Sequence, residues 1–359
     1  MKIVIFIIIV FSAFARAEKT SRNDEQFKQW LKKFPAADTD KNGTLTESEV
    51  KAFQKSRVNN GNIPTPQQNQ NRVNLMPAAT LTNVQYGSHE RNVFDFWKAE
   101  SSNPIPVLVF FHGGGFVAGD KSKYYGDPLV LRCLSNGISV VTANYRFVTT
   151  HPFPAPHHDG GRVIQYLRWK AKEWGIDTKR IACTGGSAGA NISVWLAVHD
   201  DLADRKSADP VSRESTRISF AIGNGVQTSN DPRFIWKNIV SGQPVHPSMY
   251  PFFGLKGDAD MAKSLESKML DTVARESSAI NHVTKDDPPL LLKFGKSELG
   301  SLPLPAGTAA NIYIHHPAFG KFMQEEYKKI NLECHWWYMD KPGTTDEEWD
   351  FVLKHFGRK

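Results

Sequence analysis

The stretch Gly185-Gly186-Ser187-Ala188-Gly189 decides the fold expected of this chain. It follows the short apolar run Arg180–Thr184 and precedes Ala188–Val198, whose composition predicts a helix. A G-x-S-x-G pattern at such a junction is typical of a serine held on a sharp strand-to-helix turn. The small glycines let the turn close, and the helix N-terminus behind it adds partial positive charge. Ser187 is therefore the candidate nucleophile.

A second glycine-rich stretch, His112-Gly113-Gly114-Gly115, follows the apolar run Pro106–Phe111. Glycines at this place let backbone N–H groups turn toward a carbonyl oxygen. Gly114 and Gly115, together with Ala188 after the serine, are the expected donors to an oxyanion. Small-residue turns between a strand and a helix are common, so the serine pattern alone would indicate little. The two patterns together indicate acyl-ester chemistry.

The segment after residue 75 alternates strand-like and helix-like stretches. Apolar runs predict strands at 92–97, 106–111, 138–144, 180–184, 218–224, 290–294 and 332–339. Apolar residues at helical spacing predict a helix within 159–174. Strands separated by helices predict an α/β class, with a mostly parallel sheet and helices on both of its faces.

At these patterns the chain resembles the hormone-sensitive-lipase-like branch of the α/β-hydrolase fold. Asn144-Tyr145-Arg146, the stretch Phe153–Pro156 leading to Asp159, and Asp177–Ile181 are similar to that branch as well. The resemblance covers most of residues 90–230. It implies hydrolysis of short acyl esters by a serine, a histidine and an acidic residue, with no cofactor for catalysis. The substrate expected is a small-molecule or glycan-linked acyl ester.

The C-terminal third departs from that pattern. Glu298, in the loop after the strand Leu290–Phe294, fits the position of the acid, although a surface glutamate would look the same. The base is expected after the last strand, but residues 340–348 contain no histidine. The histidines that remain as candidates, each also explicable by packing or helix entry, are His157, His158, His315, His316, His335 and His355. The base stays open, and so does the alternative of an impaired α/β-hydrolase that binds a ligand without turnover.

The segment Asp38–Glu49 fits the twelve-residue calcium loop of an EF-hand. Calcium is a hard cation that takes six to eight oxygen ligands, which explains the density of acidic and amide side chains. Asp38, Asp40 and Asn42 take ligand positions 1, 3 and 5, and Gly43 takes position 6, where the loop turns sharply. The Thr44 carbonyl takes position 7, Thr46 is expected to bind through water, and Glu49 is the bidentate ligand at position 12. A single loop favours a structural or docking Ca²⁺. A solvated acidic turn and a calcium-dependent adhesion module are the alternatives.

Four segments follow from these patterns. Lys2, the apolar run 3–14 and Ala15-Arg16-Ala17 predict a cleaved signal peptide over 1–17, although an uncleaved anchor has a similar sequence. Residues 18–57 form the expected EF-hand appendage, the polar stretch 58–75 a linker, and 76–359 the hydrolase domain. We therefore expect export to the periplasm or the exterior, and no membrane span after cleavage.

Composition and spacing argue against a nucleic-acid partner, a disulfide scaffold and a cysteine–histidine zinc site. The net charge is +7, but lysines and arginines are interleaved with acidic residues, so no nucleic-acid partner is expected. The three cysteines, Cys133, Cys183 and Cys334, are too few for a disulfide scaffold. No Cys–His spacing suggests zinc.

Overall fold

The computed structural model describes residues 20–22, 28, 31, 38–46, 48–49, 76–101, 103–242, 245–295 and 298–358. The chain divides into two compact units, Met1–Arg72 and Val73–Lys359, which are considered separately. The predicted signal peptide 1–17 and linker 58–75 lie outside the described residues. Within the described ranges, no helix combines the length and apolarity needed to cross a bilayer.

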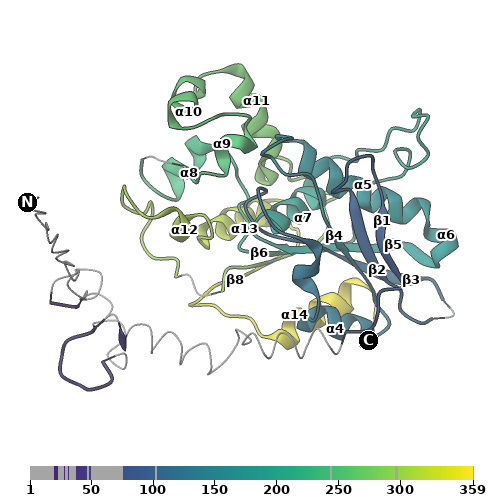
Figure 1. The fold of residues 1–359 in the computed structure, drawn as a ribbon, viewed down its shortest axis with the longest axis horizontal. Helices are drawn as coiled ribbons and strands as arrows, with labels where there is room; N and C mark the ends of the chain where they lie inside the picture. Colours follow the sequence, from purple (N-terminus) through teal and green to yellow (C-terminus); the bar gives the residue numbers. More distant parts are fainter. Residues whose placement is uncertain are drawn as a thin grey trace, which may run out of the picture. The chain divides into compact units, whose positions relative to one another are not determined.

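The larger unit is built on an eight-stranded sheet in the order β1-β2-β4-β3-β5-β6-β7-β8 (Figure 1). Strand β2 pairs antiparallel with both β1 and β4, and every other neighbouring pair is parallel. The strands are β1 Leu81–Gln85, β2 Val93–Trp97, β3 Ile105–Phe111, β4 Ser139–Ala143, β5 Ile176–Gly186, β6 Ala221–Asn224, β7 Leu290–Lys293 and β8 Cys334–Trp337. The prediction of a mostly parallel sheet is confirmed. The edge strand β1 was not predicted, because most of its residues are polar and exposed.

Eleven named α-helices are described in this unit. They are α4 Pro128–Ser135, α5 Ala155–Trp169, α6 Ala171–Trp174, α7 Ala188–Val198, α8 Pro232–Asn238, α9 Met249–Phe252, α10 Asp258–Ser264, α11 Lys268–Ser277, α12 Ala310–Tyr313, α13 Ala318–Lys329 and α14 Thr345–His355. Two 3₁₀ helices, η2 Lys121–Tyr124 and η3 Ala279–Asn281, join them. The predicted helix after the serine has the bounds of α7. The helix predicted within 159–174 begins earlier, at Ala155, and continues as α6 after a break at Lys170.

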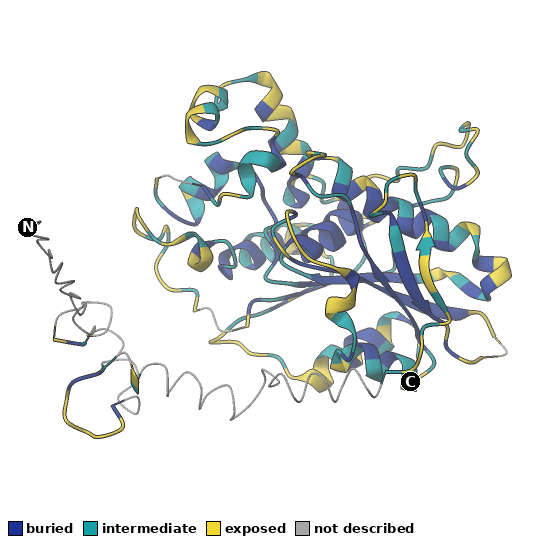
Figure 2. Cartoon of the chain, in the orientation of Figure 1, coloured by how far each residue is buried: buried dark blue, intermediate teal, exposed yellow. Residues whose placement is uncertain are grey.

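The sheet separates two apolar cores. Along β3, Val107, Val109 and Phe111 belong to one core, while Leu108 and Phe110 belong to the other. Helices α5, α7 and α13 contribute to the first core, and α4 and α14 to the second. Figure 2 shows the resulting burial, with the central strands and the inner faces of the helices in dark blue. Side chains alternate in this way because successive residues of a strand point to opposite faces of the sheet. Helices cover both faces, as predicted.

Helices α8, α9, α10 and α11 all lie between β6 and β7 in the sequence and stand together in green at the top of Figure 1. Ile235 of α8 and Phe252 of α9 are buried in the first core. The segment is therefore packed onto the sheet-and-helix body, close to where β5 and β6 end. Loops at the carboxyl ends of parallel strands are where α/β proteins bind ligands.

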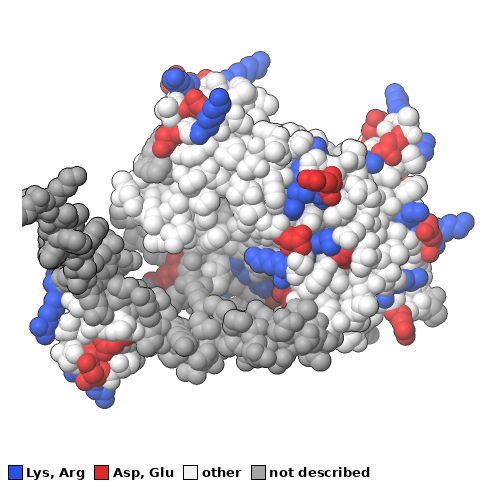
Figure 3. Space-filling view, viewed as in Figure 1, with Lys and Arg blue, Asp and Glu red and all other residues white. Residues whose placement is uncertain are grey.

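Charges on the larger unit are mixed on the face seen in Figure 3, where lysines and arginines lie beside aspartates and glutamates in small groups. Ion pairs of this unit include Arg132 with Asp346 and Arg233 with Asp271. The three cysteines are not joined in disulfides, and Cys183 is fully buried in β5.

Candidate active site

Ser187 stands at the junction of β5 and α7 with a strained backbone. Its φ of 53° and ψ of −116° lie in a region that non-glycine residues rarely adopt. A Cβ on Gly189 would lie 1.9 Å from the Phe111 carbonyl oxygen, and one on Gly185 would lie 2.5 Å from the same atom. The glycines of the pattern are thus required because β3 passes directly beside the turn. The strain is maintained by packing on both sides, as is usual at functional sites.

The glycine-rich loop after β3 lies against the serine. A Cβ on Gly113 would lie 2.7 Å from the Gly186 carbonyl oxygen and 3.5 Å from the Ser187 Cβ. Gly114 and Gly115 have φ of 117° and 60°, which L side chains rarely adopt. The loop turns back on itself because the Gly114 carbonyl accepts hydrogen bonds from the amides of residues 117 and 118, at 3.0 and 3.1 Å.

The three amides expected to stabilise an oxyanion are available. Among the described hydrogen bonds, the backbone N–H groups of Gly114, Gly115 and Ala188 have no protein acceptor. All three residues line the same cavity as Ser187. Backbone donors that converge on one point beside a nucleophile are the arrangement that stabilises a tetrahedral oxyanion.

His112, the first residue of this loop, shapes the loop and does not contact the serine. Its ring is fully buried and stacks on Tyr145, with ring centroids 4.3 Å apart. Its Nδ1 lies 2.8 Å from the Gly113 carbonyl oxygen, and the Tyr145 hydroxyl donates to the His112 carbonyl at 2.6 Å. Burial lowers the pKa of His112 to about 4, so the ring stays neutral. It holds the loop's first residues in place.

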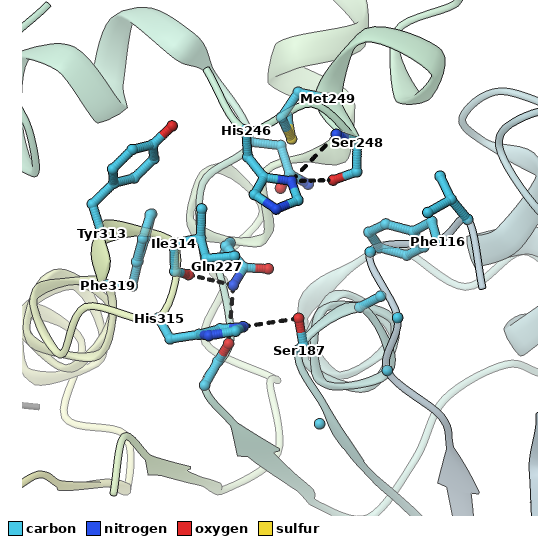
Figure 4. Close-up of a pocket in the computed structure, with 18 of the residues that line it drawn as sticks. Phe116, Ser187, Gln227, His246, Ser248, Met249, Tyr313, Ile314, His315 and Phe319 are labelled. Carbon is cyan, nitrogen blue, oxygen red and sulfur yellow. Dashed lines mark hydrogen bonds between the residues drawn. The ribbon is translucent and has the colours of Figure 1, made fainter. Parts of the chain in front are cut away.

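His315 is the histidine that reaches Ser187. Its Nε2 lies 2.9 Å from the Ser187 Oγ, and Figure 4 shows the two side chains pointing toward each other. His315 lies in the loop between α12 and α13, and its ring is partly buried. Burial, and then the nearby His246, lower its pKa below the ordinary 6.5. A neutral imidazole at this distance can accept the serine proton.

Two residues after β6 hold His315 in place. Gly225 has φ of 62°, and a Cβ there would lie 3.2 Å from the His315 Cδ2, so the ring packs directly on this glycine. The Gln227 side-chain amide donates to the Gly225 carbonyl at 3.0 Å and to the Ile314 carbonyl (Figure 4). Gln227 therefore ties the loop that carries His315 to the end of β6.

The other candidate histidines have structural partners instead. His316 is buried, accepts a hydrogen bond from the Ala318 amide at 3.2 Å and contacts the Leu299 backbone, so it is the helix-entry contact that the sequence allowed for. The Nε2 of His157 lies 2.8 Å from the Asn191 Oδ1 within an aromatic cluster. The His158 ring packs near the Trp195 ring. His335 and His355 both hydrogen-bond to the Glu333 carboxylate.

Glu298 lies in the loop after β7, where the sequence places it, and is exposed. The His315 ring is hydrogen-bonded to Ser187. Among the residues that the structure describes, no carboxylate forms a hydrogen bond with this ring. The role of Glu298 as the triad acid therefore stays a prediction.

The cavity in front of Ser187 has a volume of about 540 Å³. One side is the glycine-rich loop with Phe116. The opposite side comes from the segment between β6 and β7 and from α12 and α13, as Figure 4 shows. Most of the lining is apolar, contributed by Phe116, Val117, Ile235, Val245, Met249, Tyr313, Ile314 and Phe319. The polar side chains of the lining are Lys123, Ser187, Asn224, Gln227, Asn230, His246, Ser248 and His315.

The acidic loop of the smaller unit has its oxygen ligands gathered together. Carboxylate oxygens of Asp38, Asp40 and Glu49 lie within 4.8 Å of one another. The Gly43 amide donates to the Asp38 carboxylate at 2.8 Å, and the Thr44 amide donates to the Asn42 side chain at 2.7 Å. Hard oxygen donors held in this register by backbone amides fit a calcium ion.

The fold, with Ser187 on the turn between β5 and α7, is that of an α/β-hydrolase. The chain belongs to the BD-FAE family, whose sequence pattern matches residues 95–299. The chain is 27% identical over 190 residues to probable carboxylesterase 3 of Arabidopsis thaliana, a match that spans 48% of this chain and 59% of that protein. It is 36% identical over 104 residues to carboxylesterase NlhH of Mycobacterium tuberculosis, covering 28% and 32% of the two chains.

Solved structures agree on the fold. The acetyl ester-xyloside bifunctional hydrolase of Caldicellulosiruptor lactoaceticus superposes with a TM-score of 0.52 at 24% identity, covering 70% of this chain and 78% of that one. The chain spans less than two thirds of the two curated relatives named above.

Proposed function

We propose that this protein hydrolyses short acyl esters, with Ser187 as nucleophile and His315 as general base. The observation that carries the proposal is the 2.9 Å contact between the His315 Nε2 and the Ser187 Oγ, beside three backbone amides without protein acceptors. The carboxylesterase relatives named above support the same chemistry.

The reaction follows from this geometry. As the Ser187 Oγ attacks the ester carbonyl, its proton passes to the His315 Nε2. The carbonyl oxygen becomes an oxyanion, which the amides of Gly114, Gly115 and Ala188 stabilise. The imidazolium then protonates the leaving alcohol, and the C–O bond breaks to give an acyl-serine. Water, deprotonated by His315, attacks this ester and releases the carboxylic acid, which regenerates the serine.

The cavity favours esters with a short, apolar acyl group. Its volume and mostly apolar lining fit a small acyl chain. The alcohol part of the substrate is a small molecule or part of a glycan.

Turnover of p-nitrophenyl acetate and butyrate tests the proposal. Ser187→Ala and His315→Gln should each lower kcat by a factor on the order of 10⁴ or more, as losses within a catalytic triad do. His316→Asn is the matched control, because asparagine keeps an acceptor for the Ala318 amide and the residue does not touch the serine. Equal rates for the wild type and Ser187→Ala would refute the hydrolase and favour a ligand-binding protein.

We also propose that Asp38, Asp40, Asn42, Thr44 and Glu49 bind one structural Ca²⁺. Two hydrogen bonds between Ser21 and Leu45 support the site: the Ser21 amide donates to the Leu45 carbonyl at 2.7 Å, and the Leu45 amide donates to the Ser21 side-chain Oγ at 2.8 Å. These hydrogen bonds connect the calcium loop to Ser21, which precedes it in the chain, and so stabilise the conformation of the loop. Calorimetric titration with Ca²⁺ should show one site that Glu49→Gln weakens strongly, and unchanged affinity would contradict the ligand assignment.

We further infer that the protein is exported. The apolar run 3–14 and Ala15-Arg16-Ala17 support this inference. Fractionation followed by N-terminal sequencing should find a mature chain that begins near Glu18 outside the cytoplasm. Full-length protein in the cytoplasm would contradict it.

A further inference from the structure

A cluster of two histidines and a glutamate lies at the end of α7 that is remote from Ser187. His199 follows the last residue of α7, Glu276 lies in the last turn of α11, and His282 follows η3. One ligand atom from each residue lies within 4.8 Å of the other two. Because α7 has 11 residues, at 1.5 Å per residue the cluster is roughly 16 Å from the catalytic serine.

Both imidazoles are oriented by backbone carbonyls. The His199 Nδ1 lies 2.9 Å from the Asp200 carbonyl oxygen, and the His282 Nε2 lies 2.8 Å from the Glu276 carbonyl oxygen. A nitrogen that faces a carbonyl must carry the proton, so in each neutral ring the other nitrogen has the lone pair. Histidines that ligate metals are held in this manner, with the second N–H donated to a backbone carbonyl or carboxylate.

The contact between His199 and Glu276 needs a positive charge. The His199 Nε2 lies 2.7 Å from the Glu276 Oε1. With the proton on Nδ1, this contact would join a nitrogen lone pair to a carboxylate oxygen, which repel each other. Either a second proton on the ring or a cation between the two atoms removes the repulsion.

The surroundings favour a cation. Helices α7 and α11 both end here, and each helix C-terminus carries partial negative charge. The His199 ring is also fixed by stacking on Trp195, with ring centroids 3.9 Å apart. The Trp195 Nε1 donates to the Glu276 carbonyl at 2.8 Å, which ties the end of α11 to the nucleophile helix.

A second histidine–glutamate cluster of the chain provides a contrast. The His335 Nε2 lies 2.8 Å from the Glu333 Oε1, but the Lys354 ammonium group lies 2.9 Å from the same carboxylate. That carboxylate already has its cation. In the described contacts of Glu276, by contrast, no lysine or arginine is paired with the carboxylate.

We propose that His199, Glu276 and His282 bind a divalent transition metal ion, Zn²⁺, with water completing the coordination. Imidazole nitrogen and carboxylate oxygen are common zinc ligands, at 2.0–2.2 Å, so the three side chains close in by modest rotations on binding. The ion joins the end of α11 to the end of α7. Its role is to fix the segment between β6 and β7, which forms one wall of the cavity, onto the helix that carries the serine.

Zinc titration of the full-length protein at neutral pH, with the acidic loop saturated by millimolar Ca²⁺, tests the site. We expect one equivalent to bind, and the melting temperature to rise by roughly 5 °C at a hundredfold excess over Kd. Glu276→Gln and His282→Gln should each weaken binding by more than roughly tenfold. Co²⁺ in place of Zn²⁺ should give visible d–d absorption that these variants lose.

His335→Gln is the matched control, since it removes a histidine that also contacts a glutamate. It should bind zinc as the wild type does. The Glu276 side chain is about half exposed, so its substitution should leave the fold intact and keep the test decisive even if a histidine variant is unstable. Zinc binding that is equal in the wild type and Glu276→Gln, or a wild type that binds no zinc, would overturn the proposal and leave a protonated His199–Glu276 ion pair as the explanation.

Discussion

Replacement of Gly225 by alanine should displace His315, the proposed general base, without changing its chemistry. A Cβ at this position would lie 3.2 Å from the His315 Cδ2 and 3.4 Å from its Cγ, closer than most Cβ contacts in proteins. The ring would have to retreat by a few tenths of an ångström. It would then move relative to the Ser187 Oγ, with which its Nε2 makes the 2.9 Å contact.

The size of the effect follows from two separate costs. Alanine at φ of 62° in place of glycine costs about 1–2 kcal/mol of folding stability, as does any L residue in this region. Misplacement of reacting groups by about 1 Å can cost a factor of about 100 in rate. A smaller shift should therefore lower kcat/KM for p-nitrophenyl acetate by about tenfold, equivalent to about 1.4 kcal/mol of transition-state stabilisation.

Gly357→Ala separates the two costs. Gly357 has φ of 65°, and a Cβ there would have no atom within 4 Å, so this variant carries the backbone strain alone. Both variants should lose similar stability in thermal denaturation, while only Gly225→Ala should lose activity. If both variants hydrolyse the ester at the same rate, the packing of His315 on Gly225 does not position the base, and the reasoning fails.

Three further predictions concern single side chains. Because the pKa of His315 is lowered, its ring stays neutral to lower pH, and the acidic limb of the kcat/KM profile should have its midpoint below 6.5. His246→Gln removes a nearby positive charge, so it should raise the pKa of His315 and move this midpoint upward. A midpoint that does not move would show that His246 does not act on His315. Ser21→Ala leaves the buried Leu45 amide without its acceptor, which costs about 1–3 kcal/mol of stability. Calorimetry should therefore show weaker Ca²⁺ binding than in the wild type, and equal binding would refute a role for Ser21 in supporting the loop. If Glu298 is the triad acid, Glu298→Gln should lower kcat for p-nitrophenyl acetate by a factor on the order of 10⁴, as loss of the acid does in a serine triad, and a loss of less than tenfold would refute that role.

The local elements of the fold were predictable because their signals are local. The apolar run of β3, the glycines around Ser187 and the helix Ala188–Val198 each depend on residues that are neighbours in sequence. The glycine-rich loop could likewise be assigned, since a strand end followed by three glycines has few other uses. The edge strand β1 lacked such a signal, because only β2 beside it makes its polar residues a strand.

The sequence alone predicted the candidate nucleophile, the oxyanion loop and the class of the sheet, because each is encoded in a contiguous stretch. It did not indicate the base: six histidines were candidates, and none lies in residues 340–348, directly after the last strand. Only the tertiary structure brings a histidine, His315, beside Ser187, from which it is 128 residues away along the chain. The choice depends on how the loop between α12 and α13 packs on Gly225 and Gln227, and no pattern in the sequence near His315 records that packing.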